Sequence, residues 1–299
     1  MTARPSMGPA RALVAVVAVV SASCAAPLMK LPAGPGAPAP DITDILAQAT
    51  RTCRGIRTFT AEITVSGSVG ASRTRGRLAA GLAAPASARL EAVAPFGEPL
   101  FIFAATGNDA TLLLPRDRRV LEHGPPDEVL EAIAGVPLGA ADLRATLTGC
   151  TTGEADPGTA RQLGDLWRVA AVGAGHDAYL HRDSASAPWR LVASVLHAAG
   201  AQRGWRAEYR DFQNDLPRTV RLTSESVPPS GFDLQLVLSQ VEINVTLGPD
   251  VFRVQIPAST DPITLQELKE AGPLAPRGKT QAGRSDRGLE AKPPAAYAR

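Results

Sequence analysis

Three cysteines are the residues of this sequence with the clearest chemistry, and Cys24 is the first of them. Arg4 and Arg11 precede a wholly apolar run over residues 12–20, and only small residues separate that run from Cys24. The run is shorter than the roughly 20 apolar residues that a membrane-spanning helix needs, and it is typical of the hydrophobic core of a signal peptide. The pattern predicts a lipoprotein leader over residues 1–23, cleaved to leave a lipid-modified Cys24 as the new N-terminus.

The residues around the predicted cleavage site leave one alternative open. Ser21 stands three residues before Cys24, where Leu is usual, so the alternative is an ordinary secretory signal cut near Ala25 or Ala26. If Cys24 is acylated, each buried methylene contributes roughly 0.8 kcal/mol, which holds a soluble domain firmly on a leaflet. Ala25, and not Asp, follows Cys24, and this favours the outer membrane with the domain facing the periplasm.

The other two cysteines, Cys53 and Cys150, form an even pair once Cys24 is lipidated. An even pair in an oxidising compartment predicts a disulfide. Cys53 falls on the apolar face of a predicted helix, and Cys150 follows another predicted helix. The bond would close a loop of about 100 residues and add about 4.7 kcal/mol in the chain-entropy treatment. Two buried free thiols are the alternative.

The remaining polar residues show no pattern for catalysis or metal binding. The sequence has no Cys-x-x-Cys, no zinc-spaced histidine pair, no nucleophile elbow and no phosphate-binding glycine loop. The formal net charge of +2 does not indicate a nucleic-acid partner. We therefore predict a protein that is not an enzyme, holds no metal or cofactor and binds no nucleic acid. Its histidines are scattered, at His123, His176, His181 and His197.

Composition divides the rest of the chain into three parts. Residues 24–40 contain the cysteine and a stretch rich in Pro, Gly and Ala, which predicts an extended tether. Residues 41–271 carry regular hydrophobic patterns and are predicted to form one domain. Residues 272–299 are basic, with few large apolar side chains, and predict a disordered tail. This tail is either solvated or in contact with anionic lipid head groups.

Alternation of apolar and polar residues dominates the predicted domain. Twelve strand-like runs indicate about 10 to 11 strands, mostly joined by hairpin-length loops, because period-2 patterning is typical of half-buried strands. A sheet of this many strands rarely stays flat. The predicted fold class is therefore α+β, a single incomplete (unclosed) antiparallel barrel with helices on its open or inner side. We expect helices over 42–53, 127–134, 140–147 and 262–271, and strands over 59–65, 76–82, 88–94, 100–105, 110–114, 166–172, 179–182, 189–197, 205–210, 220–223, 232–239 and 252–256.

The inner face of this barrel is predicted to enclose a hydrophobic cavity. Each strand has one apolar face, and aromatic residues make up only 4% of the chain, so few bulky side chains are available to fill the interior. A shift of one residue would turn a strand's apolar set to the other face, so each assignment depends on parity. The residues predicted to line the cavity are Ile63, Val65, Leu90, Leu100, Ile102, Leu112, Leu222, Leu234 and Leu236.

A series of short motifs lies within residues 89–149. Strand and helix signals are separated there by a Pro-apolar-Gly turn and by a helix end of the form Gly-x-Pro-apolar. In this pattern the chain resembles the LolA and LolB lipoprotein carriers, and the lipid-anchored outer-membrane receptor type in particular. The motifs are Arg89-Leu90, Pro95-Phe96-Gly97, Gly135-Val136-Pro137-Leu138 and Asp142-Leu143 to Leu147-Thr148-Gly149, with Glu208-Tyr209-Arg210-Asp211-Phe212 and Leu216-Pro217-Arg218 further on.

The resemblance implies an unclosed β-barrel with a helical lid over a hydrophobic cavity that receives the acyl chains of lipoproteins. It also implies a membrane-inserting loop with Phe96 at its apolar tip; a Phe96 folded back onto the sheet is the alternative. The sequence departs from the family in its added tether and tail. It also has Cys150 after Gly149, where the family usually shows a small apolar-Pro turn.

These expectations combine into one functional hypothesis. The protein would be a monomer, held on the outer membrane by Cys24, that binds lipid or lipoprotein acyl chains and receives or inserts lipoproteins there. A soluble periplasmic carrier would be its donor, because a fixed anchor suits a stationary acceptor better than a shuttle. The alternative is a structural or adaptor lipoprotein of the same fold that docks an envelope complex.

Overall fold

The structure, a computed structural model, describes residues 27–94, 97–200, 203–224 and 231–272. Cys24, Phe96 and all of the predicted tail beyond Gly272 lie outside these residues. The chain divides into two compact units, Met1–Leu31 and Pro32–Arg299, and the fold below belongs to the second. Its hydrophobic core lies entirely between Ala39 and Leu268. The second unit therefore has a core of its own and is expected to fold without residues 1–31.

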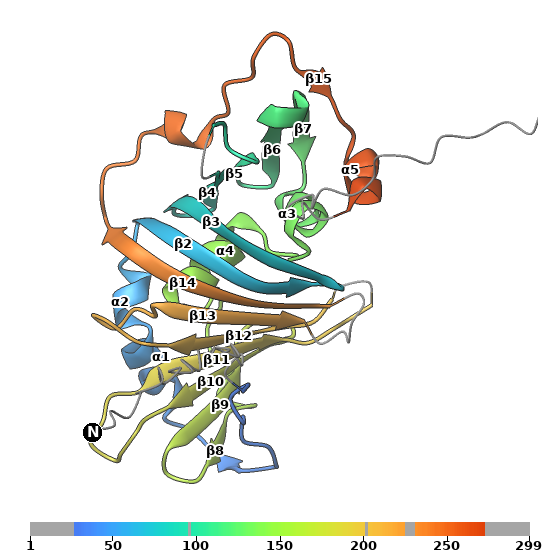
Figure 1. Cartoon of the computed structure of the whole chain (residues 1–299). Helices are drawn as coiled ribbons and strands as arrows, with labels where there is room; N and C mark the ends of the chain where they lie inside the picture. The colour runs from blue at the N-terminus through green and yellow to red at the C-terminus, as the bar shows by residue number, and fades with distance from the viewer. Residues whose placement is uncertain (1–26, 95–96, 201–202, 225–230, 273–299) are drawn as a thin grey trace, which may run out of the picture. The chain divides into compact units, whose positions relative to one another are not determined.

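The described strands form one sheet of 15 strands that is not closed (Figure 1). The order across the sheet is β1-β8-β9-β10-β11-β12-β13-β14-β2-β3-β4-β5-β6-β7-β15. The strands are β1 (Ala37–Pro38), β2 (Thr58–Val69), β3 (Ser72–Ala83), β4 (Ser87–Val93), β5 (Ile102–Thr106), β6 (Asp109–Leu114), β7 (Arg119–Gly124), β8 (Arg161–Leu163), β9 (Trp167–Ala171), β10 (His176–His181), β11 (Arg190–Leu196), β12 (Trp205–Arg210), β13 (Thr219–Ser224), β14 (Phe232–Ile243) and β15 (Asp261–Pro262).

The two halves of the chain meet in the middle of the sheet. Strands β2 to β7 follow one another in sequence and in space, as do β8 to β14, and the pairing of β14 with β2 joins the two series. Neighbours are antiparallel except β15, which is parallel to β7. Both edge strands are only two residues long, and short edges limit pairing with other chains.

The predicted number of strands is wrong. The sheet has 15 strands rather than about 10 to 11, mainly because β1, β7, β8 and β15 were not predicted. Three of these have two or three residues, too few to show alternation. In β7 the alternation is broken by an irregular pairing with β6. Residues 37–39, which were assigned to the tether, belong to the fold. Strand β1 pairs with β8, and Ala39 is fully buried.

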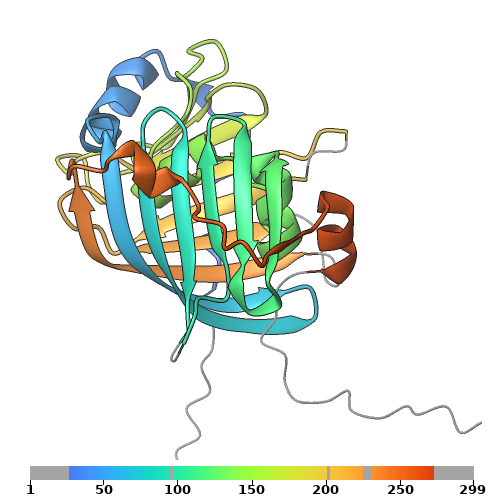
Figure 2. The same ribbon diagram turned by 90° about the horizontal axis from the view of Figure 1, so that it is seen from above.

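Five α-helices lie in the described residues: α1 (Ile42–Ala49), α2 (Arg51–Arg54), α3 (Pro126–Ala134), α4 (Ala140–Thr148) and α5 (Leu265–Ala271). The predicted helices at 42–53, 127–134 and 140–147 are confirmed, although the first is divided in two. Helix α4 packs against β3 and β4, and α3 packs against β6 and α5. Figure 2 shows α3 and α4 within the curl of the sheet. Glycines Gly135 and Gly149 end α3 and α4 with φ of 71° and 63°, the left-handed geometry that favours glycine.

The predicted last strand, over residues 252–256, is also wrong. The chain instead forms a 3-10 turn (Pro249–Phe252) and an irregular segment that packs against β4 and β5 and crosses the outside of the sheet (Figure 2). Arg89 donates hydrogen bonds from Nη1 to the carbonyl oxygens of Val251 and Arg253, at 3.1 and 3.0 Å. An arginine side chain, and not a neighbouring strand, therefore satisfies this backbone.

Candidate functional site

The inner face of the sheet is a continuous apolar surface. Residues directly opposite one another in an antiparallel pair share a face, so the strand register traces rows of side chains across the sheet. One row runs Ala61, Ala80, Leu90, Phe103, Leu112 and Leu121, across β2 to β7. A second runs Leu234, Leu222, Ala207, Ser194, Ala178 and Ala170, across β14 to β9. All the apolar members of both rows are buried.

Seven of the nine residues predicted to face inward are buried in the core cluster. Leu112 is fully buried, and the others are at most 8% exposed. They come from both halves of the chain and from strands β2, β4, β6, β13 and β14, so the fold brings distant segments onto one surface. The seven are Ile63, Val65, Leu90, Leu112, Leu222, Leu234 and Leu236.

The prediction for β5 is wrong by one residue. Leu100 is 39% exposed and precedes the strand, while Phe103 is fully buried and faces Leu90 and Leu112. Ile102 is half-buried on the opposite face, where the segment after β14 crosses β5. Because both faces of β5 are covered, its sequence lacks polar residues at alternate positions and its parity cannot be read from the pattern.

Helices α3 and α4 fill the space in front of this inner face. Their buried large apolar side chains are Val129, Leu130, Ile133, Leu143 and Leu147. The space left between α4 and strands β10 to β12 has a volume of about 10 Å³, which is near the size that admits one water molecule. At this place the predicted cavity is occupied by the protein's own helix.

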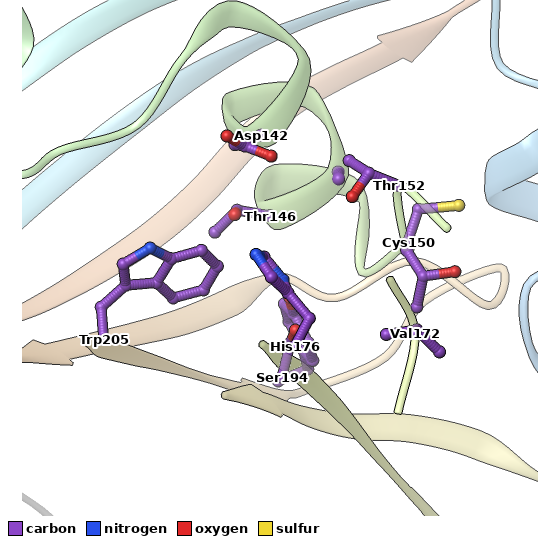
Figure 3. Close-up of a pocket in the computed structure, with 11 residues that line it drawn as sticks. Asp142, Thr146, Cys150, Thr152, Val172, His176, Ser194 and Trp205 are labelled. Atoms are coloured by element: carbon purple, nitrogen blue, oxygen red, sulfur yellow. The ribbon is translucent and has the colours of Figure 1, made fainter. Parts of the chain in front are cut away.

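The same small space is lined by polar groups from both sides (Figure 3). Asp142 and Thr146 extend from α4, and His176, Ser194 and Trp205 extend toward them from the strands. The rings of His176 and Trp205 meet edge-on, with centroids 5.6 Å apart. Burial raises the pKa of Asp142 above its usual value. Burial also lowers the pKa of His176, and the nearby Asp142 opposes that shift. Protonation of His176 is therefore disfavoured while α4 stays packed.

The end of α4 is tied to α2 by a disulfide. The Sγ atoms of Cys53 and Cys150 are 2.12 Å apart, and their Cα atoms are 5.7 Å apart. Both residues are buried, and they are separated by 97 positions in sequence. The bond therefore holds the C-terminal end of α4 beside α2.

A groove that sequence reasoning missed lies beside α3. It has a volume of about 580 Å³ and is bordered by the β2–β3 turn, α3 and α5. Its lining combines small residues, Gly70, Ala71 and Ala132 among them, with the charged side chains of Glu131, Arg203 and Lys269. Lys269 pairs with Glu128 across α5 and α3, with 2.6 Å between Nζ and Oε2. The residues that line the groove come from separate segments of the chain, so no local pattern in the sequence could have indicated the groove.

The histidines and their carboxylate neighbours form no metal site in the described residues. In the described parts of the chain, no group of three or more His, Cys, Asp and Glu side chains is arranged to hold a metal ion. Asp177 lies 2.8 Å from the Nε2 atom of His197, which directly follows β11. His181 lies near Asp183, at 3.8 Å, and His123 contacts Asp109.

Comparison with known proteins identifies the fold. No protein-family model and no curated protein matches the sequence. Among solved structures, the chain is similar to a LolA-superfamily protein of Nitrosomonas europaea, with a TM-score of 0.50 at 11% identity, over 71% of this chain and 97% of that one. It is also similar to the lipoprotein LppX of Mycobacterium tuberculosis, with a TM-score of 0.30 at 13% identity, over 70% and 99%. The chain therefore has a LolA/LolB-like fold.

Proposed function

We propose that this protein is a lipid-anchored envelope protein that binds acyl chains on the inner face of its sheet. In this proposal Cys24 carries the anchor and holds the domain at the outer membrane. The cargo is a lipid or the acylated end of a lipoprotein, and a soluble periplasmic carrier delivers it. The observation that carries the proposal is the buried apolar inner face, which α3 and α4 cover in a LolA/LolB-like fold.

The energies of exchanging the helices for an acyl chain support this proposal. An acyl chain with about 15 methylenes gains roughly 12 kcal/mol when it leaves water, at about 0.8 kcal/mol each. The five large apolar side chains of α3 and α4 gain about 2 kcal/mol each by burial, or roughly 10 kcal/mol together. Because the two quantities are similar, an acyl chain can replace the helices on the sheet without a large net cost. In the proposal, α3 and α4 are the lid.

The groove beside α3 provides the entrance in this proposal. It lies next to the helix whose displacement would expose Leu112 and its neighbours on β6, and its small side chains leave room for a chain of methylenes. Phe96, in the loop between β4 and β5, is proposed to dip into the membrane interface during transfer. Replacing Phe96 with Glu should leave the fold intact but reduce the delivery of cargo to vesicles.

A fluorescent fatty acid tests the proposal. The variant Ala71→Trp places a large side chain at the exposed β2–β3 turn, on the wall of the groove. In the unit of residues 32–272, we expect it to slow uptake of the fatty acid without changing the thermal midpoint. Ala185→Trp, in an exposed loop away from the groove, is the matched control. If the wild-type unit neither binds the fatty acid nor co-purifies with lipid, the proposal is wrong.

One observation favours a second candidate, a structural or adaptor lipoprotein that docks an envelope complex. The space under α4 is only about 10 Å³, as expected for a domain whose own side chains fill its interior. A wild-type unit that binds no acyl chain but captures an envelope complex would support this candidate.

A further inference from the structure

The outer face of β3 carries a row of three arginines. Arg73, Arg75 and Arg77 alternate along the strand, so their side chains lie on one face, and all three are exposed. Within the described residues, their guanidinium groups make neither hydrogen bonds nor ion pairs. Successive members are about 6.7 Å apart along the strand. Three positive charges therefore stand close together in solvent without an ion-pair partner among the described residues, although the exposed Glu62, opposite Ala79, shares this face.

Other arginines on the same face differ, because carboxylates compensate them. Arg221 on β13 makes two hydrogen bonds to the carboxylate of Asp233 on β14, at 2.9 and 2.7 Å. Arg206 and Arg210 on β12 both pair with Glu208, which is fully buried. Among these arginines, only the three on β3 have no carboxylate partner in the described part of the chain, and their side chains are exposed to solvent.

Exposed valines lie on both sides of the row. Arg77 is directly opposite Val93 on β4 and opposite Thr64 on β2, and Thr64 is in turn opposite Val237 on β14. Opposite residues share a face, so the two valines belong to the same surface as the arginines. Val93 is 50% exposed and Val237 is 39% exposed. We call this set of five residues, Arg73, Arg75, Arg77, Val93 and Val237, the β3 patch.

Protection of a sheet edge explains only part of the β3 patch. The pairing of β3 with β4 ends at Arg77 and Val93, so residues 72–76 form a free edge, and charges on an edge discourage pairing with other chains. Arg77, however, lies where β3 is paired on both sides, and edge protection does not require exposed valines. The segment after β14 covers the outer face farther along, near Gly81 and Arg89, and leaves the β3 patch open.

We propose that the β3 patch docks the protein onto the anionic head groups of a phospholipid bilayer. Arginine forms paired hydrogen bonds with phosphate oxygens, and each cation close to an anionic leaflet favours binding. The valines enter the interface between head groups. The β3 patch contains no aromatic side chain on which nucleic-acid bases would stack. The inference goes beyond acyl-chain binding, because it concerns the opposite face of the sheet and does not depend on a cavity.

Vesicle binding tests this docking surface. We would use the unit of residues 32–272, which contains the whole core but neither the anchor nor the basic tail. It should bind vesicles of equal parts phosphatidylcholine and phosphatidylglycerol, less tightly as salt is raised, and should not bind pure phosphatidylcholine. The triple variant Arg73→Gln, Arg75→Gln, Arg77→Gln should lose binding on the order of a hundredfold. The single variant Arg75→Gln should lose about fivefold.

A charge-matched control is available on the same chain. Arg51, Arg54 and Arg57 are also exposed, and their triple replacement by Gln removes the same charge away from the β3 patch, because Arg57 lies beside the opposite end of β3 at Ala84. It should leave vesicle binding within about twofold of the wild type. Equal losses in the two triple variants, or no binding to the anionic vesicles, would overturn the proposal.

Two further measurements distinguish membrane docking from acyl-chain binding and from docking of an acidic protein. Fatty-acid binding is recorded on the same samples, so loss of vesicle binding alone leaves the acyl-chain proposal intact. Polyglutamate serves as an acidic polypeptide probe. If the β3 patch variants lose binding to polyglutamate while the wild type ignores anionic vesicles, the surface is one for an acidic protein and the membrane proposal is wrong.

Discussion

The bond between Cys53 and Cys150 gives the most quantitative prediction. It closes a loop with a sequence separation of 97, for which the chain-entropy treatment gives about 4.7 kcal/mol of stabilisation. Both cysteines are buried, at 3% and 7% exposure, so the double variant Cys53→Ala, Cys150→Ala also loses some packing. We expect the free energy of unfolding to fall by about 5 kcal/mol. The C-terminal end of α4 is also released.

Urea unfolding of residues 32–272, followed by tryptophan fluorescence, measures this loss, and reduced wild-type protein is the matched control. The reduced protein should unfold near the double variant. Fatty-acid uptake should also be faster in the double variant, because the C-terminal end of α4 is no longer tied to α2. Two free thiols in unfolded, unreduced wild type, or a loss below about 1 kcal/mol, would contradict a stabilising bond between Cys53 and Cys150.

Three further predictions concern the inner face, the pH response and the loop. Leu112→Ala should cost about 2–5 kcal/mol of unfolding free energy because Leu112 is fully buried, whereas Leu100→Ala should cost under about 0.5 kcal/mol; similar losses would contradict the inward assignment. Burial lowers the pKa of His176 in the folded protein. As the pH falls, the His176 side chain therefore becomes protonated at a higher pH in the unfolded chain than in the folded one. Stability should therefore fall below about pH 6.5, and His176→Gln should reduce that dependence; parallel pH curves would refute it. Phe96→Glu should leave the urea midpoint unchanged but slow the transfer of a labelled lipopeptide to vesicles, and unchanged transfer would exclude a role for the loop.

Local signals were sufficient for the helices that cover the sheet. Gly135 and Gly149 mark the ends of α3 and α4 in the sequence, and the structure places both at left-handed positions where glycine is favoured. The strands β2 and β12 to β14 were equally clear, because one of their faces is buried and the other is more open. In each case the information lies within a few residues of the element itself.

Long-range packing decided the features that the sequence did not reveal. The inward face of β5 was assigned wrongly because the segment after β14 covers its outer side. The short strands β1, β8 and β15 exist only through their partners. The filled interior was equally hidden, since the aromatic content suggested a void and the side chains of α3 and α4 occupy it instead.

Photo-crosslinking identifies the face of the sheet that an acyl chain contacts. Residues 32–272 would be incubated with a fatty acid that carries a photoreactive diazirine, irradiated, digested and analysed by mass spectrometry. Fragment-ion spectra assign each label to a residue, and acyl-chain binding on the inner face predicts labels on Leu90, Leu112 and Leu222 that excess unlabelled fatty acid suppresses. Labels confined to the outer-face residues Val93 and Val237, or labels that excess fatty acid does not suppress, would contradict it.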